Sequence, residues 1–220
     1  MFVVYAGTRN QYHQMVLAAK SLLAWNDVKV KFLIEDDEFP EPLDPAIECI
    51  NVSDQYYFRE DGPNYNQKWT YMTLMRLAFP LMFPDEDRIL WLDNDTLVKG
   101  DITPLLKTKM SECVAAAVVE YPRSIEPFLY FNAGVLLMEP KRINGQELVN
   151  YINTHKLRFP DQDCINILLQ GRILPLSEKW NASQFTGDPG DSVIVHFAGA
   201  YKALAERAFR KYEDKEWRQQ

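Results

Sequence analysis

The chain has 220 residues, of which 47% are hydrophobic and 25% are charged, the ordinary balance of a folded globular protein. The formal net charge is −7 and the pI about 5.1. This charge excludes a broad basic surface, so we expect neither nucleic acid nor an anionic membrane as the main partner. A bound phosphate compound would need local groups or a metal to neutralise it.

The three cysteines are widely spaced and form no CxxC pair, so the sequence predicts neither a disulfide framework nor a zinc site. The first residues lack the basic segment and apolar run of a signal peptide, and no stretch reaches the ~18 apolar residues of a membrane span. From these features we expect a cytoplasmic protein that is not an integral membrane protein.

The first part of the chain alternates between strand and helix patterns. Residues 2–6 are β-branched and aromatic and predict a strand, and apolar residues recur at helical spacing over 11–25. Strands are predicted at 28–34 and 46–52. A polar, aromatic loop is expected over 53–66.

The same alternation continues to the end of the chain. Helical periodicity over 67–82 meets Pro80, which should disturb the helix near its end. Further on, we expect strands at 89–92, 113–120, 133–139 and 192–198, and helices at 145–154, 162–169 and 201–217. Uncharged apolar strands interleaved with helices predict a single α/β domain with a Rossmann-like, mainly parallel central sheet.

Two aspartates follow the apolar strand at 89–92. Asp93 and Asp95 stand one residue apart, and side chains i and i+2 of an extended chain point the same way. Ligands of parallel sheets gather beyond the carboxyl ends of the strands. Carboxylate oxygens suit Mg²⁺ or Mn²⁺, which keep positions open for substrate phosphates. The alternative interpretation is a polar turn in which these side chains cap backbone donors.

A histidine lies in the late segment "VIVHFAGAYK". A neutral His196 could complete a carboxylate-rich Mn²⁺ site, Gly199 would let the backbone approach a diphosphate, and Lys202 could supply a point charge. The alternative is that His196 is an ordinary core residue, which is the commoner role of a lone histidine on an apolar strand.

Two further polar clusters occur between these motifs. Asn132 in "FNAGVLLM" could read sugar hydroxyls because a carboxamide both donates and accepts, or it could cap a turn. Asp161, Gln162 and Asp163 follow Pro160. Acidic residues at that position are also favoured as helix-start groups, so this cluster has a structural explanation as well.

Taken in order, these segments resemble glycosyltransferase family 8, the glycogenin and bacterial galactosyltransferase type with a GT-A fold. The likeness is carried by "VVYAGTRNQYHQMVLAAKSLL", "LMRLAFPLMFPDEDRILWLDNDTLV", "FNAGVLLM", "DQDCIN" and "HFAGAYK". The resemblance implies retaining transfer of a hexose from a nucleotide-diphosphate sugar, with UDP-glucose or UDP-galactose expected. It implies Mn²⁺, or alternatively Mg²⁺, as cofactor. The acceptor stays open among a glycan, a lipid-linked molecule and a protein.

The resemblance also implies roles for individual residues. Asp93 and Asp95 match the family's metal-binding D-x-D, and His196 matches its third metal ligand. Gln162 is similar to the residue near the anomeric carbon, and Asp163 is a rival participant in the reaction. The residues expected to bind the donor are Ala6, Thr8, Asn10, Arg76, Asn94, Asn132, Asp161, Gly199 and Lys202. An amide at Gln162 is a poor nucleophile, so a front-face path is favoured over double displacement.

The chain departs from the family pattern at two places. The family often has an acidic residue facing the uracil, where this sequence has Thr8 and Arg9. The family's lysine is commonly followed by Pro-Trp, whereas Ala203 and Leu204 follow Lys202 here. These departures bear on the identity of the base and on the wall of the donor site.

Two other functions compete with sugar transfer. A phosphatase of the haloacid dehalogenase type has a strand followed by D-x-D-x-T, but here Thr96 comes one place too early. A nucleotide-sugar-binding protein without turnover would need the same motif residues. A nucleotidylyltransferase is disfavoured because the first turn, "AGTRNQ", offers one glycine and one arginine.

Two surface segments allow two interpretations each. The expected helix at 201–217 mixes acidic and basic residues, so it is either a solvated helix with ion pairs or a face that rests on an anionic membrane. The aromatic residues of 53–66, together with Trp69, form either a lid over sugars or ordinary packing at the rim.

Overall fold

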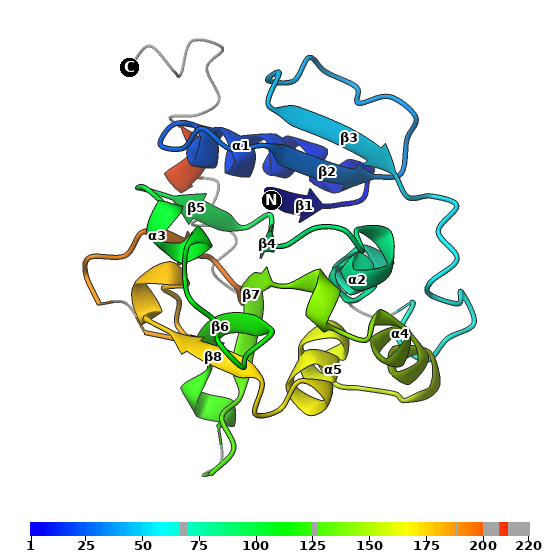
Figure 1. The fold of residues 1–220 in the computed structure, drawn as a ribbon. Helices are drawn as coiled ribbons and strands as arrows, with labels where there is room; N and C mark the ends of the chain where they lie inside the picture. The colour runs from blue at the N-terminus through cyan, green and yellow to red at the C-terminus, as the bar shows by residue number, and fades with distance from the viewer. Residues whose placement is uncertain (67–69, 125–126, 188, 200–206, 211–220) are drawn as a thin grey trace.

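The computed structural model describes residues 1–66, 70–124, 127–187, 189–199 and 207–210. Within them the chain forms a seven-stranded central sheet and a separate two-stranded sheet (Figure 1). In spatial order the central strands are β3 (Ile47–Asn51), β2 (Val30–Ile34), β1 (Phe2–Ala6), β4 (Ile89–Leu92), β7 (Phe131–Met138), β6 (Ala115–Val119) and β8 (Ile173–Leu176). The small sheet pairs β5 (Thr96–Val98) with β9 (Ile194–His196).

The direction of one strand distinguishes this sheet from a fully parallel one. β1 runs parallel to β2 and β4, β2 to β3, and β6 to β8. Only β7, among the described strands of this sheet, is antiparallel to its neighbours, β4 and β6. The expected mainly parallel sheet is therefore confirmed. Because β7 is reversed, its first residues lie at the carboxyl end of β4.

The first strand–helix unit follows the prediction closely. All five residues of β1 are buried. A 3-10 turn, η1 (Arg9–Gln11), precedes α1 (Tyr12–Leu23), whose buried face covers one side of the sheet. Alternate residues of β1 enter two separate core layers, with Val3 in the layer beneath α1 and Val4 in the opposite one.

The helix expected over 67–82 differs from the prediction. Residues 67–69 lie outside the described part of the chain, η2 (Tyr71–Ala78) is a 3-10 helix, and α2 (Phe79–Met82) follows it directly. Pro80 lies in the first turn of α2. Proline is tolerated there because the first N–H groups of a helix have no partner within it. The helical stretch is thus divided next to Pro80, as expected, and the proline lies in the first turn of the second piece, α2.

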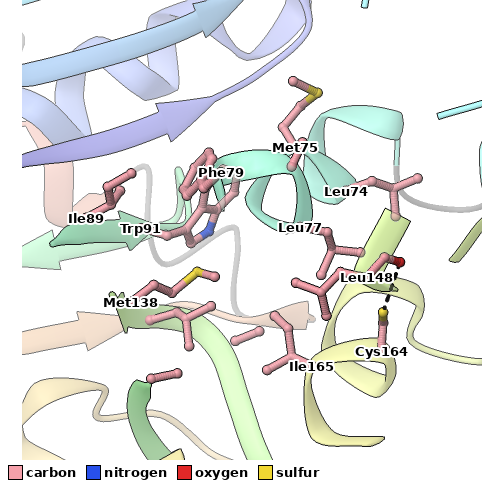
Figure 2. Packing of buried hydrophobic residues seen from close by; sticks show 14 of the residues in the cluster. Leu74, Met75, Leu77, Phe79, Ile89, Trp91, Met138, Leu148, Cys164 and Ile165 are labelled. Carbon is pink, nitrogen blue, oxygen red and sulfur yellow. Dashed lines mark hydrogen bonds between the residues drawn. The ribbon is translucent and has the colours of Figure 1, made fainter. Parts of the chain in front are cut away.

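The second core layer holds η2 against two helices, α4 (Gly145–Thr154) and α5 (Pro160–Leu168). Figure 2 shows Leu77 of η2 with Leu148 of α4 and Ile165 of α5. Each of these side chains is at most 2% exposed, and burying one such side chain stabilises a fold by about 1.5–3 kcal/mol. This packing gives η2 a defined place beside the sheet.

Three elements were not anticipated: β5, β8 and α3 (Thr103–Leu106). β8 contains Pro175 and, among the described strands, pairs with β6 alone. Proline is confined to edge strands because it cannot donate to the sheet, and its presence hid this strand from the periodicity analysis. β5 and α3 are too short to show a clear pattern.

Three other expectations meet the structure in different ways. Cys49, Cys113 and Cys164 are all free thiols, as expected. Among the described residues, no helix combines the length and apolarity needed to cross a bilayer. Most of the helix expected at 201–217 lies outside the described residues, although 207–209 are helical.

Candidate functional site

Side chains from two distant segments meet at the carboxyl end of β4. Asp93 and Asp95 follow β4, and His196 is the last residue of β9. The His196 Nε2 atom lies 3.6 Å from Asp93 Oδ2 and 3.2 Å from Asp95 Oδ1. The small sheet brings them together, since Thr96 pairs with His196 and the Phe197 N–H donates to the Asp95 carbonyl at 2.9 Å.

These three side chains fit a divalent cation. One ligand atom from each lies within 4.8 Å of the others, and the carboxylates are 29% and 15% exposed while the imidazole is 4% exposed. Two hard oxygen ligands and one imidazole nitrogen suit Mn²⁺ or Mg²⁺, and the partly open carboxylates leave an approach from solvent. Asp93, Asp95 and His196 could therefore hold a metal ion.

The negative charges of Asp93 and Asp95 affect the pKa of His196. Burial acts to lower the pKa of His196, but the neighbouring Asp95 and Asp93 carboxylates outweigh burial and raise the pKa overall. The site is therefore an environment that favours a positive charge.

The backbone and one carboxylate oxygen of Asp93 are held in place by neighbours. Its N–H donates to Gly134 at 2.9 Å, and its carbonyl accepts from the Thr96 hydroxyl at 2.7 Å. Its Oδ1 accepts from Arg76 Nη2 and from Trp91 Nε1, both at 2.7 Å. These contacts leave Oδ2 facing the imidazole.

The guanidinium of Arg76 connects Asp93, after β4, to Asp161, on α5. Arg76 is 2% exposed and lies 4.1 Å over the Trp91 ring. It pairs with Asp93 at 2.7 Å and with Asp161, on α5, at 3.2 Å, and also donates to the Ala133 carbonyl. A buried cation requires such partners. Burial raises the pKa of Asp161 even though Arg76 acts to lower it.

Asp163 lies in the first turn of α5, as its alternative interpretation proposed. Its carboxylate accepts from the Arg158 N–H at 3.1 Å, from the Phe159 N–H at 2.9 Å and from the Tyr130 hydroxyl. These donors precede or flank the helix start, so the side chain caps it. The predicted part of Asp163 in the reaction remains a prediction.

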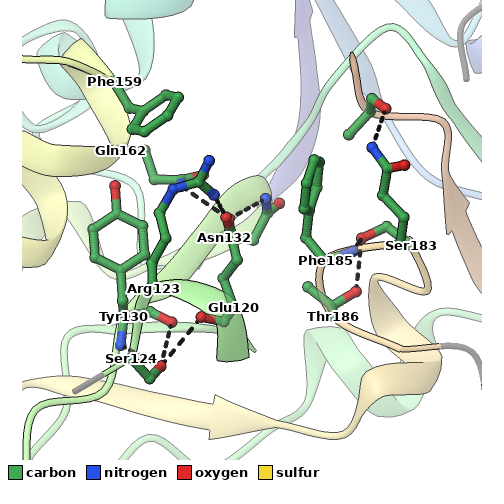
Figure 3. A network of polar contacts seen from close by, with 12 residues as sticks. Glu120, Arg123, Ser124, Tyr130, Asn132, Phe159, Gln162, Ser183, Phe185 and Thr186 are labelled. Atoms are coloured by element: carbon green, nitrogen blue, oxygen red, sulfur yellow. Dashed lines mark hydrogen bonds and ion pairs between the residues drawn. The ribbon is translucent and has the colours of Figure 1, made fainter. Parts of the chain in front are cut away.

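The Gln162 side chain faces β7 and β6. Its Oε1 accepts from the Ala133 N–H at 2.9 Å, and its Nε2 donates to Glu120 Oε2 at 3.0 Å. Asn132 Nδ2 donates to the same Glu120 oxygen at 3.0 Å. Figure 3 shows both amides beside Glu120. The structure thus brings together two residues that were predicted to lie near the donor sugar.

Gly134 provides the space that His196 occupies. A Cβ at this position would lie 2.1 Å from His196 Cε1, closer than any real contact. A glycine inside an apolar strand often marks such a close approach. The sequence analysis placed Gly134 at the start of a strand and missed this requirement.

The first turn of the chain is linked to the D-x-D segment by Asn94. Its Nδ2 donates to the Ala6 carbonyl at 2.8 Å, and Gln14 Nε2 donates to the Asn94 carbonyl at 3.1 Å. The Oδ1 atom of Asn94 is buried and has no hydrogen-bond partner among the residues that the structure describes. Since such an atom loses hydration without compensation, it is a natural acceptor for a ligand.

The other polar groups of the first turn have partners either within the turn or on a neighbouring loop. The Thr8 hydroxyl donates to Asn10 Oδ1, and the Thr8 N–H donates to Gln11 Oε1 at 3.1 Å. Arg9 forms an ion pair with Asp36, donating from Nε at 2.8 Å. The Asp36 carboxylate therefore compensates the only cation that the sequence offers in this turn.

Two predicted donor residues follow β9. Gly199 has φ +67°, a conformation that residues other than glycine rarely adopt. Lys202, with Ala203 and Leu204, lies outside the described residues, as does Trp69.

Glu120 and Asn181 were missed by the sequence analysis. Glu120 follows β6, which runs parallel to β4, so it lies at the same sheet edge as Asp93. A carboxylate after an uncharged strand was the signal that could have identified it. Asn181 follows the short 3-10 helix η5 (Glu178–Trp180), and no motif indicated its role.

Comparisons with known proteins agree on one family. The profile described as "Glycosyl transferase family 8" matches residues 2–205. A lipopolysaccharide 1,2-glucosyltransferase of Escherichia coli K12 is 33% identical in an alignment 133 residues long, which covers 52% of this chain and 39% of that protein. Glycosyltransferase GlyE of Streptococcus pneumoniae is 28% identical over 212 residues, covering 88% of this chain and 50% of that protein. The chain thus spans half or less of these two relatives.

Solved structures show the same fold. Galactosyltransferase LgtC, in complex with donor and acceptor sugar analogues, superposes with a TM-score of 0.72 at 23% identity, covering 100% of this chain and 99% of that one. GlyE superposes with a TM-score of 0.73 at 24% identity, covering 98% of this chain and 60% of that one. The fold is of the GT-A type, and the profile match over most of the sequence shows that the chain belongs to glycosyl transferase family 8.

Proposed function

We propose that the chain transfers a hexose from a nucleotide-diphosphate sugar, UDP-glucose or UDP-galactose, to a sugar, lipid-linked or protein acceptor with retention of configuration. Mn²⁺ is the proposed cofactor, held by Asp93, Asp95 and His196. The observation that carries the proposal is the meeting of these three side chains, from distant segments, at the edge of a family 8 fold.

The contacts around Asp93 support a prearranged site. Arg76 and Trp91 hold one carboxylate oxygen, so the other keeps its orientation without a ligand present. When bound, Mn²⁺ would supply Lewis-acid stabilisation of the negative charge on the departing diphosphate. The Asp93 and Asp95 carboxylates would supply the negative charge of that site, and together with the His196 imidazole they would fix its position.

The surroundings of Asn94 support a nucleoside-binding role for the first turn. No group in the described part of the chain donates to its buried Oδ1, and an N–H or hydroxyl of the nucleoside would supply a donor. Ala6 and Thr8 would contribute the adjoining backbone, while Asn132 and Asp161 would lie on the sugar side. This arrangement supports a nucleotide sugar over a simple phosphomonoester.

The amide of Gln162 supports retention without a covalent intermediate. Its Oε1 already accepts from the Ala133 N–H, and an amide is a poor nucleophile. The nearby Asp163 carboxylate is taken up by three donors at the helix start. Both observations favour a front-face path, in which the leaving phosphate assists deprotonation of the acceptor.

A thermal-shift screen of nucleotide sugars with Mn²⁺ or EDTA tests the proposal. A ligand at 100 times its Kd stabilises the folded state by about 2.7 kcal/mol, so the correct donor should raise Tm only when Mn²⁺ is present. The donor that binds is then tested for slow hydrolysis and for transfer. Absence of Mn²⁺-dependent stabilisation by every UDP-sugar would contradict the proposal.

The same assay separates the alternatives. Donor binding with neither transfer nor hydrolysis would favour a binding protein without turnover. Release of phosphate from a phosphomonoester without a nucleotide sugar would favour a phosphatase.

A further inference from the structure

Three buried polar side chains form a series of hydrogen bonds that ends at His196, one of the candidate metal ligands. Glu120, Asn132 and Asn181 are 0%, 5% and 0% exposed. They lead, by direct hydrogen bonds, from the end of β6 to His196. Because buried polar groups need partners, reversing one amide in this line would leave its neighbours mismatched.

The carboxylate of Glu120 sets the direction at one end. It forms an ion pair with Arg123, and the carboxylate of an ion pair can only accept hydrogen bonds. Its Oε2 receives the amide NH₂ groups of Asn132 and Gln162, each at 3.0 Å (Figure 3). The amide nitrogen of Asn132 must therefore point toward Glu120.

A backbone group sets the direction of Asn132 independently. The Gly134 N–H, which can only donate, lies 3.0 Å from Asn132 Oδ1. The same oxygen accepts from Asn181 Nδ2 at 2.8 Å. The orientation of Asn132 is thus determined from both sides, and it requires Asn181 to present its NH₂ to Asn132.

The orientation of Asn181 in turn determines which ring nitrogen of His196 carries hydrogen. Since Asn181 Nδ2 is used by Asn132, its Oδ1 faces His196 Nδ1 at 3.0 Å. An amide oxygen can only accept, so Nδ1 must carry the hydrogen. In the neutral ring Nε2 then carries no hydrogen, and this atom faces Asp93 and Asp95.

We propose that Asn181 is a positioning residue that holds His196 as the Nδ1–H tautomer and so leaves Nε2 available to a divalent cation. The inference deepens the proposed function and rests on its metal site. Outer partners of this kind commonly orient ligating histidines. Without this order, Asp95 would draw the hydrogen to Nε2, 3.2 Å away. The same Glu120 oxygen also accepts from Gln162. One carboxylate therefore orients side chains at both the proposed metal site and the proposed reaction centre.

The first experiment uses the unaltered, metal-free protein at a pH at which the His196 ring is neutral, because an imidazolium carries hydrogen on both nitrogens. Long-range ¹H–¹⁵N spectra of ¹⁵N-histidine-labelled protein report which ring nitrogen carries hydrogen. The chain has three histidines, and the exposed His13 and His155 are assigned with His13→Gln and His155→Gln variants. We expect hydrogen on His196 Nδ1. A ring protonated only at Nε2 overturns the proposal.

The second experiment measures Mn²⁺ affinity by calorimetry without any donor. Asn181→Leu removes the acceptor at similar size and should weaken Mn²⁺ binding by about 10–100-fold. Asn181→Asp restores an acceptor for Nδ1 but loses the donor to Asn132 Oδ1, so it should recover only part of the affinity. The matched control is Asn26→Leu. Asn26 is 9% exposed, and within the described residues its side chain bonds to the backbone of Leu22, Gly100 and Ile102, away from the site. Its loss should therefore lower Tm and leave Mn²⁺ affinity unchanged.

The outcomes separate the two proposals. Unchanged Mn²⁺ affinity in folded Asn181→Leu overturns the role of Asn181 and leaves the proposed function standing. If the unaltered protein binds no Mn²⁺, the metal site and this inference fall together. Should Asn181→Leu fail to fold, the histidine spectrum of the unaltered protein decides the question.

Discussion

The molecule contains the same acidic pattern twice, with different results. Asp93 and Asp95 flank Asn94 after a strand, and both carboxylates face one imidazole. Asp161 and Asp163 flank a glutamine in the first turn of α5. There one carboxylate pairs with a buried arginine and the other caps the helix start.

The difference comes from the backbone. After β4, residues 94–95 form a turn that is closed by the Thr96 N–H donating to the Asp93 carbonyl at 3.0 Å, so the extended segment expected from the sequence is not present there. This turn and the pairing of β5 with β9 direct both carboxylates toward His196. In a helix, two residues are separated by about 200° of rotation and point apart. D-x-D spacing alone therefore does not indicate a shared metal, because the backbone conformation between the two aspartates decides where their side chains point.

The largest effect is expected at Arg76, which joins the two acidic pairs. Arg76→Met leaves Asp93 and Asp161 without their buried cation, and removing one partner of a buried pair costs about 3–5 kcal/mol. Urea unfolding measures the loss. Adding Asp161→Asn removes one unpaired charge and should restore part of the stability. No recovery in the double variant would argue against an Arg76–Asp161 coupling.

Replacing a proposed metal ligand should have the next largest effect. Asp95→Ala should weaken Mn²⁺ binding by more than about 100-fold, since residues that act only behind the ligands already cost 10–100-fold. The fold should persist because the carboxylate lies at the edge of the core. Calorimetry and circular dichroism measure the two properties. Full transfer activity of this variant in EDTA would rule out the metal site.

Gly134 tests whether the imidazole needs its present position. In Gly134→Ala the new methyl group would lie 2.1 Å from His196 Cε1, so the ring must move. Overpacking of this kind costs about 1–3 kcal/mol, and Mn²⁺ affinity should fall with it. Gly100→Ala is the matched control, since its Cβ would meet Val193 at an ordinary 3.5 Å. Equal Mn²⁺ affinities in both variants would contradict the interpretation.

Asp163 should behave as a cap and not as a ligand. Asp163→Asn weakens the hydrogen bonds to the Arg158 and Phe159 N–H groups, and loss of a helix cap typically costs about 1 kcal/mol. Chemical unfolding measures this cost. Mn²⁺ affinity, measured by calorimetry, should match that of the unaltered protein. A strong loss of Mn²⁺ binding would remove the contrast between the two acidic pairs.

The smallest effect concerns pH. Burial raises the pKa of Asp161 above its ordinary 3.8, despite Arg76. The folded state therefore binds more protons than the unfolded state, and the unfolding free energy falls as pH rises from about that value through the folded-state pKa. Asp161→Asn removes this contribution, so its stability should vary less with pH across the window. Unfolding series at several pH values measure the slope, and an unchanged slope would contradict the assignment.

Part of the site was predictable from the sequence because its signals are local. The apolar run before Asp93 and Asp95 marked a strand end. His196 was predicted to join them, and the structure brings its ring within 3.6 Å of both carboxylates. The family resemblance added Gln162 and Asn132 to the expected neighbourhood, and the two residues share a hydrogen-bond acceptor.

The sequence by itself determined the succession of strands and helices, because hydrophobic periodicity is a property of neighbouring residues. It also supplied the acidic pair and the histidine. Only the tertiary structure decided that β7 runs antiparallel, which brings Gly134 against His196, and that Glu120 and Asn181 order the hydrogen bonds behind that ring. Strand direction and hydrogen-bond order depend on contacts between segments far apart in the chain, and no local pattern records those contacts.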